Sequence, residues 1–203
     1  MVGSSDYPDQ VRKPTMPPQL GEPLPVELAN TTYAVRGRMQ DGLHTPEQLA
    51  LWLTGVRDRL PVPLTDADLR AVGEGDLERA RAIRDAVRDI AASAVRGETP
   101  APEAVEQLNR QVAAVPCWRE LRWGAAPQAD LRMQAPPVVA ALAAIAQAAV
   151  DLFGGAGLSS LRACPGPGCV LFFVQDHPRR RWCSVGCGNR ARAARHYARV
   201  RGS

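Results

Sequence analysis

Four cysteines near the carboxyl end constrain the fold of this chain more than any other feature. Cys164 and Cys169 form a C-x4-C pair, thirteen residues follow, and Cys183 and Cys187 form a C-x3-C pair. Two short cysteine loops, one on a hairpin and one at a helix start, supply the four soft ligands that tetrahedral zinc prefers. A segment of about 40 residues buries too little surface to fold alone, so bound metal is expected to supply much of its folding free energy. The sequence therefore predicts one structural Zn²⁺ bound by these four residues.

Three other uses of four cysteines fit the sequence less well. Two disulfides would suit an exported chain, but the segment Met1–Pro8 lacks the basic and then apolar pattern of a secretory signal. An iron–sulfur cluster also takes four thiolates, but here the surroundings are basic and no redox motif accompanies them. A catalytic zinc needs an open coordination position, which four thiolates would close. We therefore expect a structural metal in a cytoplasmic protein.

The positive charge of the chain is concentrated in the same carboxyl-terminal segment. Residues 162–203 hold nine arginines, no lysine and one acid, Asp176, whereas residues 1–161 hold 16 basic and 20 acidic residues. A basic appendage on an acidic body is typical of proteins that bind nucleic acids. Arginine in particular pairs with phosphates and with the O6 and N7 edge of guanine.

The last helix is expected to present arginines to a nucleic acid. Ser184 is suited to cap a helix over residues 185–199, and steps of 100° group basic side chains on one side of it. On another side lie three alanines that are expected to face the metal-binding segment or the body, Ala191, Ala194 and Ala198. The predicted nucleic-acid contacts are Arg179, Arg180, Arg181, Arg192, Arg195 and Arg199. Arg190 and Asn189 are expected to lie near the metal, where Arg190 would offset part of the net −2 charge of a zinc ion with four thiolates.

Upstream of the cysteines the sequence predicts a mainly helical body. Capping residues and apolar spacing predict helices near residues 46–56, 65–73, 76–97, 102–114 and 137–153. The last of these is built mainly from alanine, which favours a buried helix over a membrane span. Alternating apolar and charged residues predict two short strands over Cys117–Trp123 and Ala129–Gln134. Trp52, Trp118 and Trp123 are expected to fill the core or to line a pocket, and Cys117 to be buried.

The expected fold class is mainly α with a small β-hairpin (α+β). Residues 1–23 are rich in proline and are expected to form a flexible lead. A helical domain would follow over residues 24–157, and a small four-cysteine zinc-finger module over residues 158–203. Gly154, Gly155 and Gly157 would form the joint between the two.

The segment around the second cysteine pair resembles the CGNR zinc finger. The resemblance rests on the run Cys187-Gly188-Asn189-Arg190 and on the residues before it, Trp182, the strand-like segment Leu171–Asp176 and the basic segment Arg179–Arg181. In that family the finger usually ends bacterial proteins whose upstream part, the ABATE domain, is described as a stress-induced transcription regulator. Residues 24–31 and 45–53 are similar to the start of such a domain. The resemblance assigns no ligand role to Asn30 and Thr31.

Together these observations predict a transcription regulator that binds DNA, or RNA in its place, through its zinc-stabilised finger. The helical domain would sense a small effector or form a homodimer, and no membrane partner is expected. The alternative is a zinc-stabilised adaptor whose tail binds an acidic protein. An enzyme is not expected, because no nucleophile in the sequence is paired with a base in a recognised arrangement.

Overall fold

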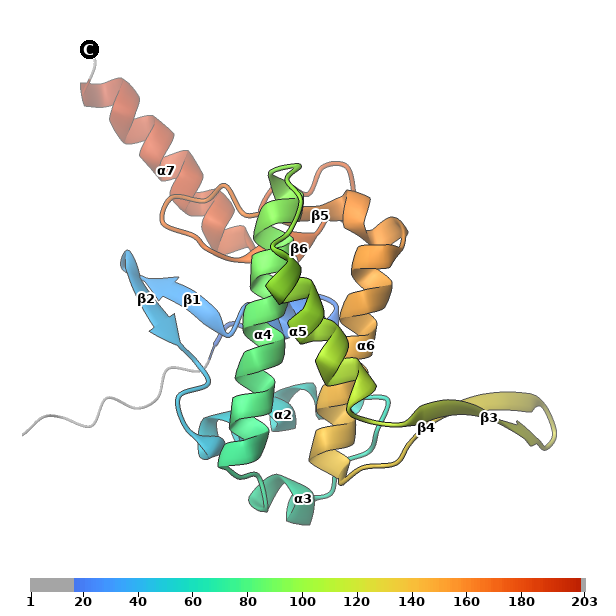
Figure 1. Cartoon of the computed structure of the whole chain (residues 1–203). Helices are drawn as coiled ribbons and strands as arrows, with labels where there is room; N and C mark the ends of the chain where they lie inside the picture. Colours follow the sequence, from blue (N-terminus) through green and yellow to red (C-terminus); the bar gives the residue numbers. More distant parts are fainter. Residues whose placement is uncertain (1–16, 202–203) are drawn as a thin grey trace, which may run out of the picture.

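The structure is a computed structural model that describes residues 17–201 (Figure 1). Its helices are α1 (Leu24–Ala29), α2 (Pro46–Val56), α3 (Asp66–Arg70), α4 (Glu74–Val95), α5 (Pro102–Ala113), α6 (Pro137–Gly154) and α7 (Val185–Arg201), with 3-10 turns η1 (Arg57–Arg59) and η2 (Ala156–Ser160). Its strands are β1 (Thr32–Val35), β2 (Arg38–Asp41), β3 (Cys117–Trp123), β4 (Pro127–Met133), β5 (Leu161–Ala163) and β6 (Phe172–Val174). The strands form three two-stranded antiparallel hairpins. Because helices make up most of the regular structure, the predicted fold class, mainly α with a small β component, is confirmed.

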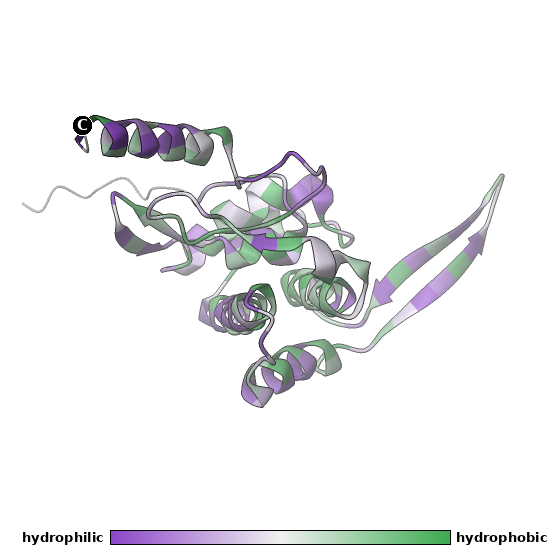
Figure 2. Ribbon diagram, turned by 90° about the horizontal axis from the view of Figure 1, so that it is seen from above, coloured by the Kyte–Doolittle hydropathy of each residue, from purple (hydrophilic) through white to green (hydrophobic). Residues whose placement is uncertain are grey.

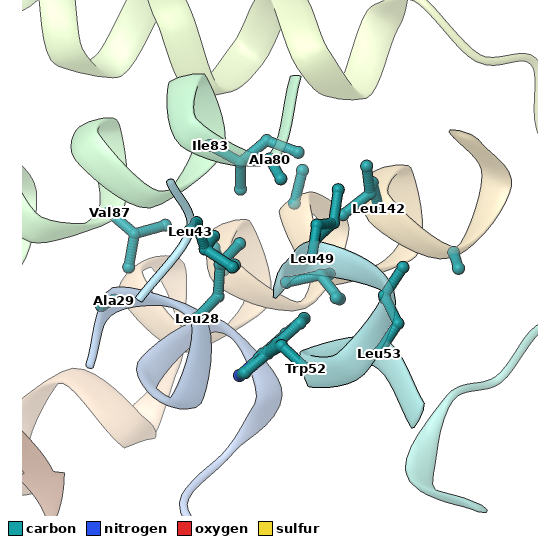
Figure 3. Packing of buried hydrophobic residues seen from close by; sticks show 14 of the residues in the cluster. Leu28, Ala29, Leu43, Leu49, Trp52, Leu53, Ala80, Ile83, Val87 and Leu142 are labelled. Carbon is teal, nitrogen blue, oxygen red and sulfur yellow. The ribbon is translucent and has the colours of Figure 1, made fainter. Parts of the chain in front are cut away.

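The hydrophobic core lies where α1, α2, α4 and α6 meet (Figure 3). From α2, Leu49 and Trp52 point toward Leu28 of α1, while Ile83 of α4 and Leu142 of α6 close the cluster from the other side. Trp52 is only 1% exposed, as the apolar spacing of α2 predicts. This core is large enough to hold the helical body together.

Capping residues fix where the helices of the body begin. Thr45 accepts a hydrogen bond from the Gln48 amide while the Gln48 side chain accepts one from Thr45, a capping box that confirms the predicted start of α2. Thr65 and Asp68 make the same reciprocal contact at the start of α3. α4 begins at Glu74, two residues earlier than expected, because Asp76 caps the Gly73 amide.

The alanine-rich helix α6 is a core helix, as predicted. Among the helices of residues 17–201 it is the one whose length and composition would allow a membrane span. Half of it is buried inside the protein, where nine of its residues belong to the core.

The β1–β2 hairpin was not predicted from the sequence. Its two-residue turn consists of Arg36 and Gly37, both with positive φ, at 50° and 78°. The sequence of such a turn is usually Asn-Gly or Asp-Gly, so arginine at the first position makes the turn hard to predict. The strand signal is also short, since each strand has four residues.

The β3–β4 hairpin has the predicted strands but not the predicted burial. It projects from the body as a thin arm, with apolar and polar bands alternating along it (Figures 1 and 2). Trp118 is 50% and Trp123 is 79% exposed, and Cys117 is exposed as well, so the expectation that these residues fill the core was wrong. Alternation predicts a two-faced ribbon, but it does not show whether the same chain covers either face.

Part of the predicted flexible lead contacts the folded protein. Residues 1–16 lie outside the described residues, but residues 17–23 lie against the finger through Leu20 and Glu22. The domain boundaries at residues 24 and 158 stay a prediction.

Candidate metal centre

The four cysteines come together at one end of the body. Their sulfur atoms all lie within 4.8 Å of one another, with 3.8 Å between Cys169 and Cys183 and 3.4 Å between Cys183 and Cys187. Four sulfurs at 2.3 Å from a zinc ion would lie about 3.8 Å apart, so the donor set and its spacing fit zinc. The predicted convergence of Cys164, Cys169, Cys183 and Cys187 is therefore present.

The first cysteine pair is presented by the loop of the β5–β6 hairpin. The Cys164 amide donates to the Leu171 carbonyl at 2.9 Å, which continues the hairpin ladder, and the Cys169 amide donates to Gly166 at 2.9 Å. Gly168 has a φ of +68°, a conformation that favours glycine and lets the loop turn back beneath the sulfurs.

The second cysteine pair is presented by the start of α7. Ser184 caps this helix, since its Oγ accepts a hydrogen bond from the Cys187 amide at 3.3 Å. Cys183 lies directly before this cap and Cys187 lies in the first turn of the helix, so the two sulfurs come within 3.4 Å of each other. The metal would therefore join the β5–β6 loop directly to the base of α7.

The pKa values of three thiols are shifted by burial and by their neighbours in the cluster. The hydrogen bond with Cys183 lowers the pKa of Cys169 to about 5, and the same contact raises the pKa of Cys183 above its usual range. Burial raises the pKa of Cys164. Negative charges this close together repel one another, and a divalent cation among the sulfurs would stabilise the thiolate forms.

Each residue of the CGNR run makes different contacts. Cys187 contributes its sulfur, and Arg190 donates from Nη2 to this sulfur at 2.9 Å. A Cβ atom at Gly188 would lie 3.1 Å from Cδ1 of Trp182, so glycine allows the indole to pack closely on the helix. Asn189 is exposed and accepts a hydrogen bond from Arg192, and its place near the metal stays a prediction.

Asn30 fastens the finger to the helical body. Its Nδ2 donates to the Phe172 carbonyl and its Oδ1 accepts from the Phe172 amide, both at 2.9 Å, and the side chain is fully buried. The Phe172 ring packs in a small cluster with Val26 and Ala91 of the body. Thr31 donates to the Leu28 carbonyl at 2.7 Å. Asn30 and Thr31 therefore have structural contacts.

Arg180 is engaged in contacts inside the protein. Its guanidinium forms an ion pair with the buried carboxylate of Glu22, donates to the Val174 carbonyl at 3.1 Å and lies 5.0 Å from the centre of the Phe173 ring. Burial raises the pKa of Glu22, although the Val174 amide and Arg180 act in the opposite direction. These contacts occupy much of the guanidinium within the protein, and the nucleic-acid contact of Arg180 stays a prediction.

The other predicted contacts lie on an exposed surface that includes α7. Figure 1 shows this helix extending away from the body, and Figure 2 shows its mixture of polar and apolar residues. The exposed arginines are Arg179, Arg181, Arg192, Arg195 and Arg199. The expectation that three alanines pack inward holds for Ala191 alone, because Ala194 and Ala198 lie beyond the point where the helix leaves the finger.

Sequence reasoning missed a stripe of arginines on α4 that supports this end of the body. Arg81 donates to the Leu43 carbonyl at 2.8 Å, and Arg84 pairs with Asp41. Arg88 donates to the Ala29 carbonyl at 2.8 Å, and its guanidinium lies 5.6 Å from the centre of the Phe172 ring. Their spacing of three and four residues would have revealed a shared helix face.

Comparison with known families gives two matches. A model of the ABATE family, described as "putative stress-induced transcription regulator", matches residues 22–156, which is more than half of the chain. A model of the CGNR zinc finger matches residues 160–200. A search of curated proteins found no match.

Proposed function

Because the chain belongs to the ABATE family of transcription regulators and carries a CGNR zinc finger, we propose that it binds DNA through this finger and α7. The observation that carries the proposal is a basic helix that is exposed from Arg192 onward and whose base carries Cys187 of the four-cysteine cluster, with Cys183 directly before it. A regulator that acts on bacterial DNA works in the cytoplasm, and we infer that location together with the function.

The dimensions and charge of α7 suit the major groove. Its 17 residues span about 25 Å, and an α-helix with its side chains fits a groove about 12 Å wide. Arg192, Arg195 and Arg199 recur at three- and four-residue spacing along one side. Arg179 and Arg181 lie in the loop that leads into the second cysteine pair, where they would contact the flanking phosphates.

Zinc has a structural role in this proposal. When bound, it supplies the link between the β5–β6 loop and the start of α7. The Arg190 contact with Cys187 compensates part of the thiolate charge. The remaining exposed arginines are then available to the nucleic acid.

The test is fluorescence anisotropy of labelled duplex DNA with the full-length, zinc-loaded protein. The full chain is required because Asn30 and Glu22, which hold the finger, lie outside it. If four or five arginines contact phosphates, log K should fall with log salt concentration with a slope of roughly −4. Binding that does not depend on salt would contradict the proposal.

A triple variant and a matched control complete this experiment. Replacing Arg192, Arg195 and Arg199 by alanine should reduce the salt slope by about 3, since each phosphate contact contributes close to one. The control replaces Arg70 and Arg110, exposed arginines of the body, and should leave the slope unchanged. Equal effects of the two variants would exclude α7 as the DNA-binding surface.

A protein-binding role for α7 is the second candidate function. Tyr197 and Val200 are 66% and 62% exposed on this helix, which would suit an adaptor that contacts another protein. Loss of partner binding in the triple variant, with DNA binding unchanged, would favour the adaptor.

The helical body offers a site for an effector. An apolar cleft of about 540 Å³ lies between α4, α5, α6 and η2 and is lined by residues that include Ile90, Leu108 and Phe153. We infer that an apolar small molecule would bind there. The tryptophans expected to line a pocket are not among its lining residues.

A further inference from the structure

The β3–β4 arm has one apolar face that the described part of the chain leaves largely exposed. Alternate residues of a strand lie on the same face, and the strand register pairs Leu121 with Ala129 and Trp123 with Pro127. This apolar face of the arm consists of Cys117, Leu121, Trp123, Pro127, Ala129, Leu131 and Met133, together with Arg119. Leu121 is 64% exposed. Water therefore covers most of an apolar surface that extends along the whole arm.

The opposite face of the arm is polar, and its charges are already paired. Arg122 forms an ion pair with Asp130, and Arg132 forms one with Glu120. Trp118 is the large apolar residue of this face, where it lies opposite Arg132. Because its charges compensate one another, this face is suited to water.

A hairpin with an exposed apolar face is stabilised when another surface covers that face. A single two-stranded hairpin is marginally stable in water, and every residue of β3 is exposed. Contiguous exposed apolar surface on a soluble protein marks an interaction site. The position of the arm, away from the helices, leaves its apolar face accessible to another molecule (Figure 1).

We propose that the apolar face of the arm packs against the same face of a second copy of this chain. Three arginines and two acids give the arm a charge close to zero, so it has little attraction for a nucleic acid or for an acidic protein. An apolar face with little charge can pack against the same face of a second copy, which is what a two-fold symmetric interface requires. Arg119 donates to the Ala129 carbonyl at 3.5 Å, and its guanidinium can reach water at the edge of such an interface.

The size of the face sets the strength of the contact. Seven residues per strand give a length of about 24 Å. Two such faces would bury on the order of 1,000 Å² in total, near the lower limit for a specific interface. The proposed dimer is therefore reversible and depends on protein concentration.

Steric constraints favour an antiparallel arrangement of the two arms. Each body lies at the base of its arm, so an antiparallel pair keeps the two bodies at opposite ends. The tip residue Trp123 would then lie over Cys117 and Met133 at the base of the partner arm, and sulfur–aromatic contacts are favourable. The dimer would carry two fingers, but its formation does not depend on DNA binding.

The two exposed tryptophans provide a matched test, because one lies on each face of β3. The measurement is analytical ultracentrifugation of the full-length, zinc-loaded protein over a wide concentration range. We expect a monomer–dimer equilibrium for the wild type. Trp123→Ser should raise Kd at least about 30-fold, since each dimer loses two large aromatic residues from the interface, whereas Trp118→Ser should change it less than about threefold. Unchanged zinc content and thermal unfolding of dilute samples would show that both variants fold.

Several results would overturn the proposal. A wild-type protein that stays monomeric at every concentration would do so, as would a dimer that both substitutions weaken equally or that neither weakens. A monomeric wild type whose DNA affinity falls in Trp123→Ser would assign the arm to DNA instead. Loss of DNA binding with an intact dimer would contradict the proposed function alone.

Discussion

The helical body and the finger are held together by different forces. The body has a core of aliphatic side chains around Trp52, to which each of the helices α1 to α6 contributes. The buried cluster of the finger consists mainly of its own metal ligands, with Leu171 and Phe173 beside them and Tyr33 supplied by the body. The body is therefore stabilised by burial of its own apolar surface, whereas the finger depends on a cation and on its neighbour.

Removal of zinc should produce the largest effect and should affect the two regions unequally. We expect chelation, or Cys183→Ser, to unfold the finger, because a structural zinc contributes about 10–16 kcal/mol to modules of this kind. The helices of the body should remain, which circular dichroism together with limited proteolysis would show.

Cys117→Ser is the matched control for the zinc experiment. This cysteine lies in the arm, outside the cluster, so the variant should keep one zinc per chain by native mass spectrometry. A chain that is fully folded without metal, or a body that unfolds together with the finger, would contradict the difference between the regions.

A substitution in the core of the body should come next in size. Trp52→Ala removes a fully buried side chain and should lower the free energy of unfolding by about 3–5 kcal/mol, measured by urea denaturation. Trp123→Ala, at an exposed site of the same residue type, should change the stability of the monomer by less than about 0.5 kcal/mol. Similar losses in the two variants would show that the arm is part of the folded core.

The contact between the two regions should contribute least. Asn30→Ala leaves the buried amide and carbonyl of Phe172 without partners, at a cost of about 2–4 kcal/mol. We expect the loss to appear first as faster hydrogen exchange in β5, β6 and the start of α7. Asn109→Ala, on an exposed face of α5, is the control. Exchange that rises equally throughout the body would show that Asn30 supports the body and has no particular role at the contact.

The features that could best be predicted from the sequence are those that neighbouring residues determine. The Thr45 and Gln48 capping box fixed the start of α2, and the spacing of the cysteines predicted a cluster of two pairs, one in a short loop and one at the start of a helix. Local chemistry is sufficient in these cases because Thr45 and Gln48, and the two cysteines within each pair, are separated by five residues or fewer.

Contacts between distant residues were not predictable in the same way. Glu22 and Arg180 are 158 residues apart, and Asn30 and Phe172 are 142 apart, so nothing near either partner reveals the other. The prediction that Trp123 is buried was wrong for a related reason. Alternation describes the two faces of a hairpin and does not show what surrounds them. The available signal for Asn30 was its place directly after the apolar run of α1.

The short helix α1 joins two parts of the molecule that sequence comparison describes separately. Leu28 belongs to the core of the body, and two residues later Asn30 holds the backbone of the finger. The finger therefore depends on residues of the body for its structure. Transplanted onto another protein it would lose the amide clamp and the Tyr33 ring, and with them the support beneath its metal-binding loops.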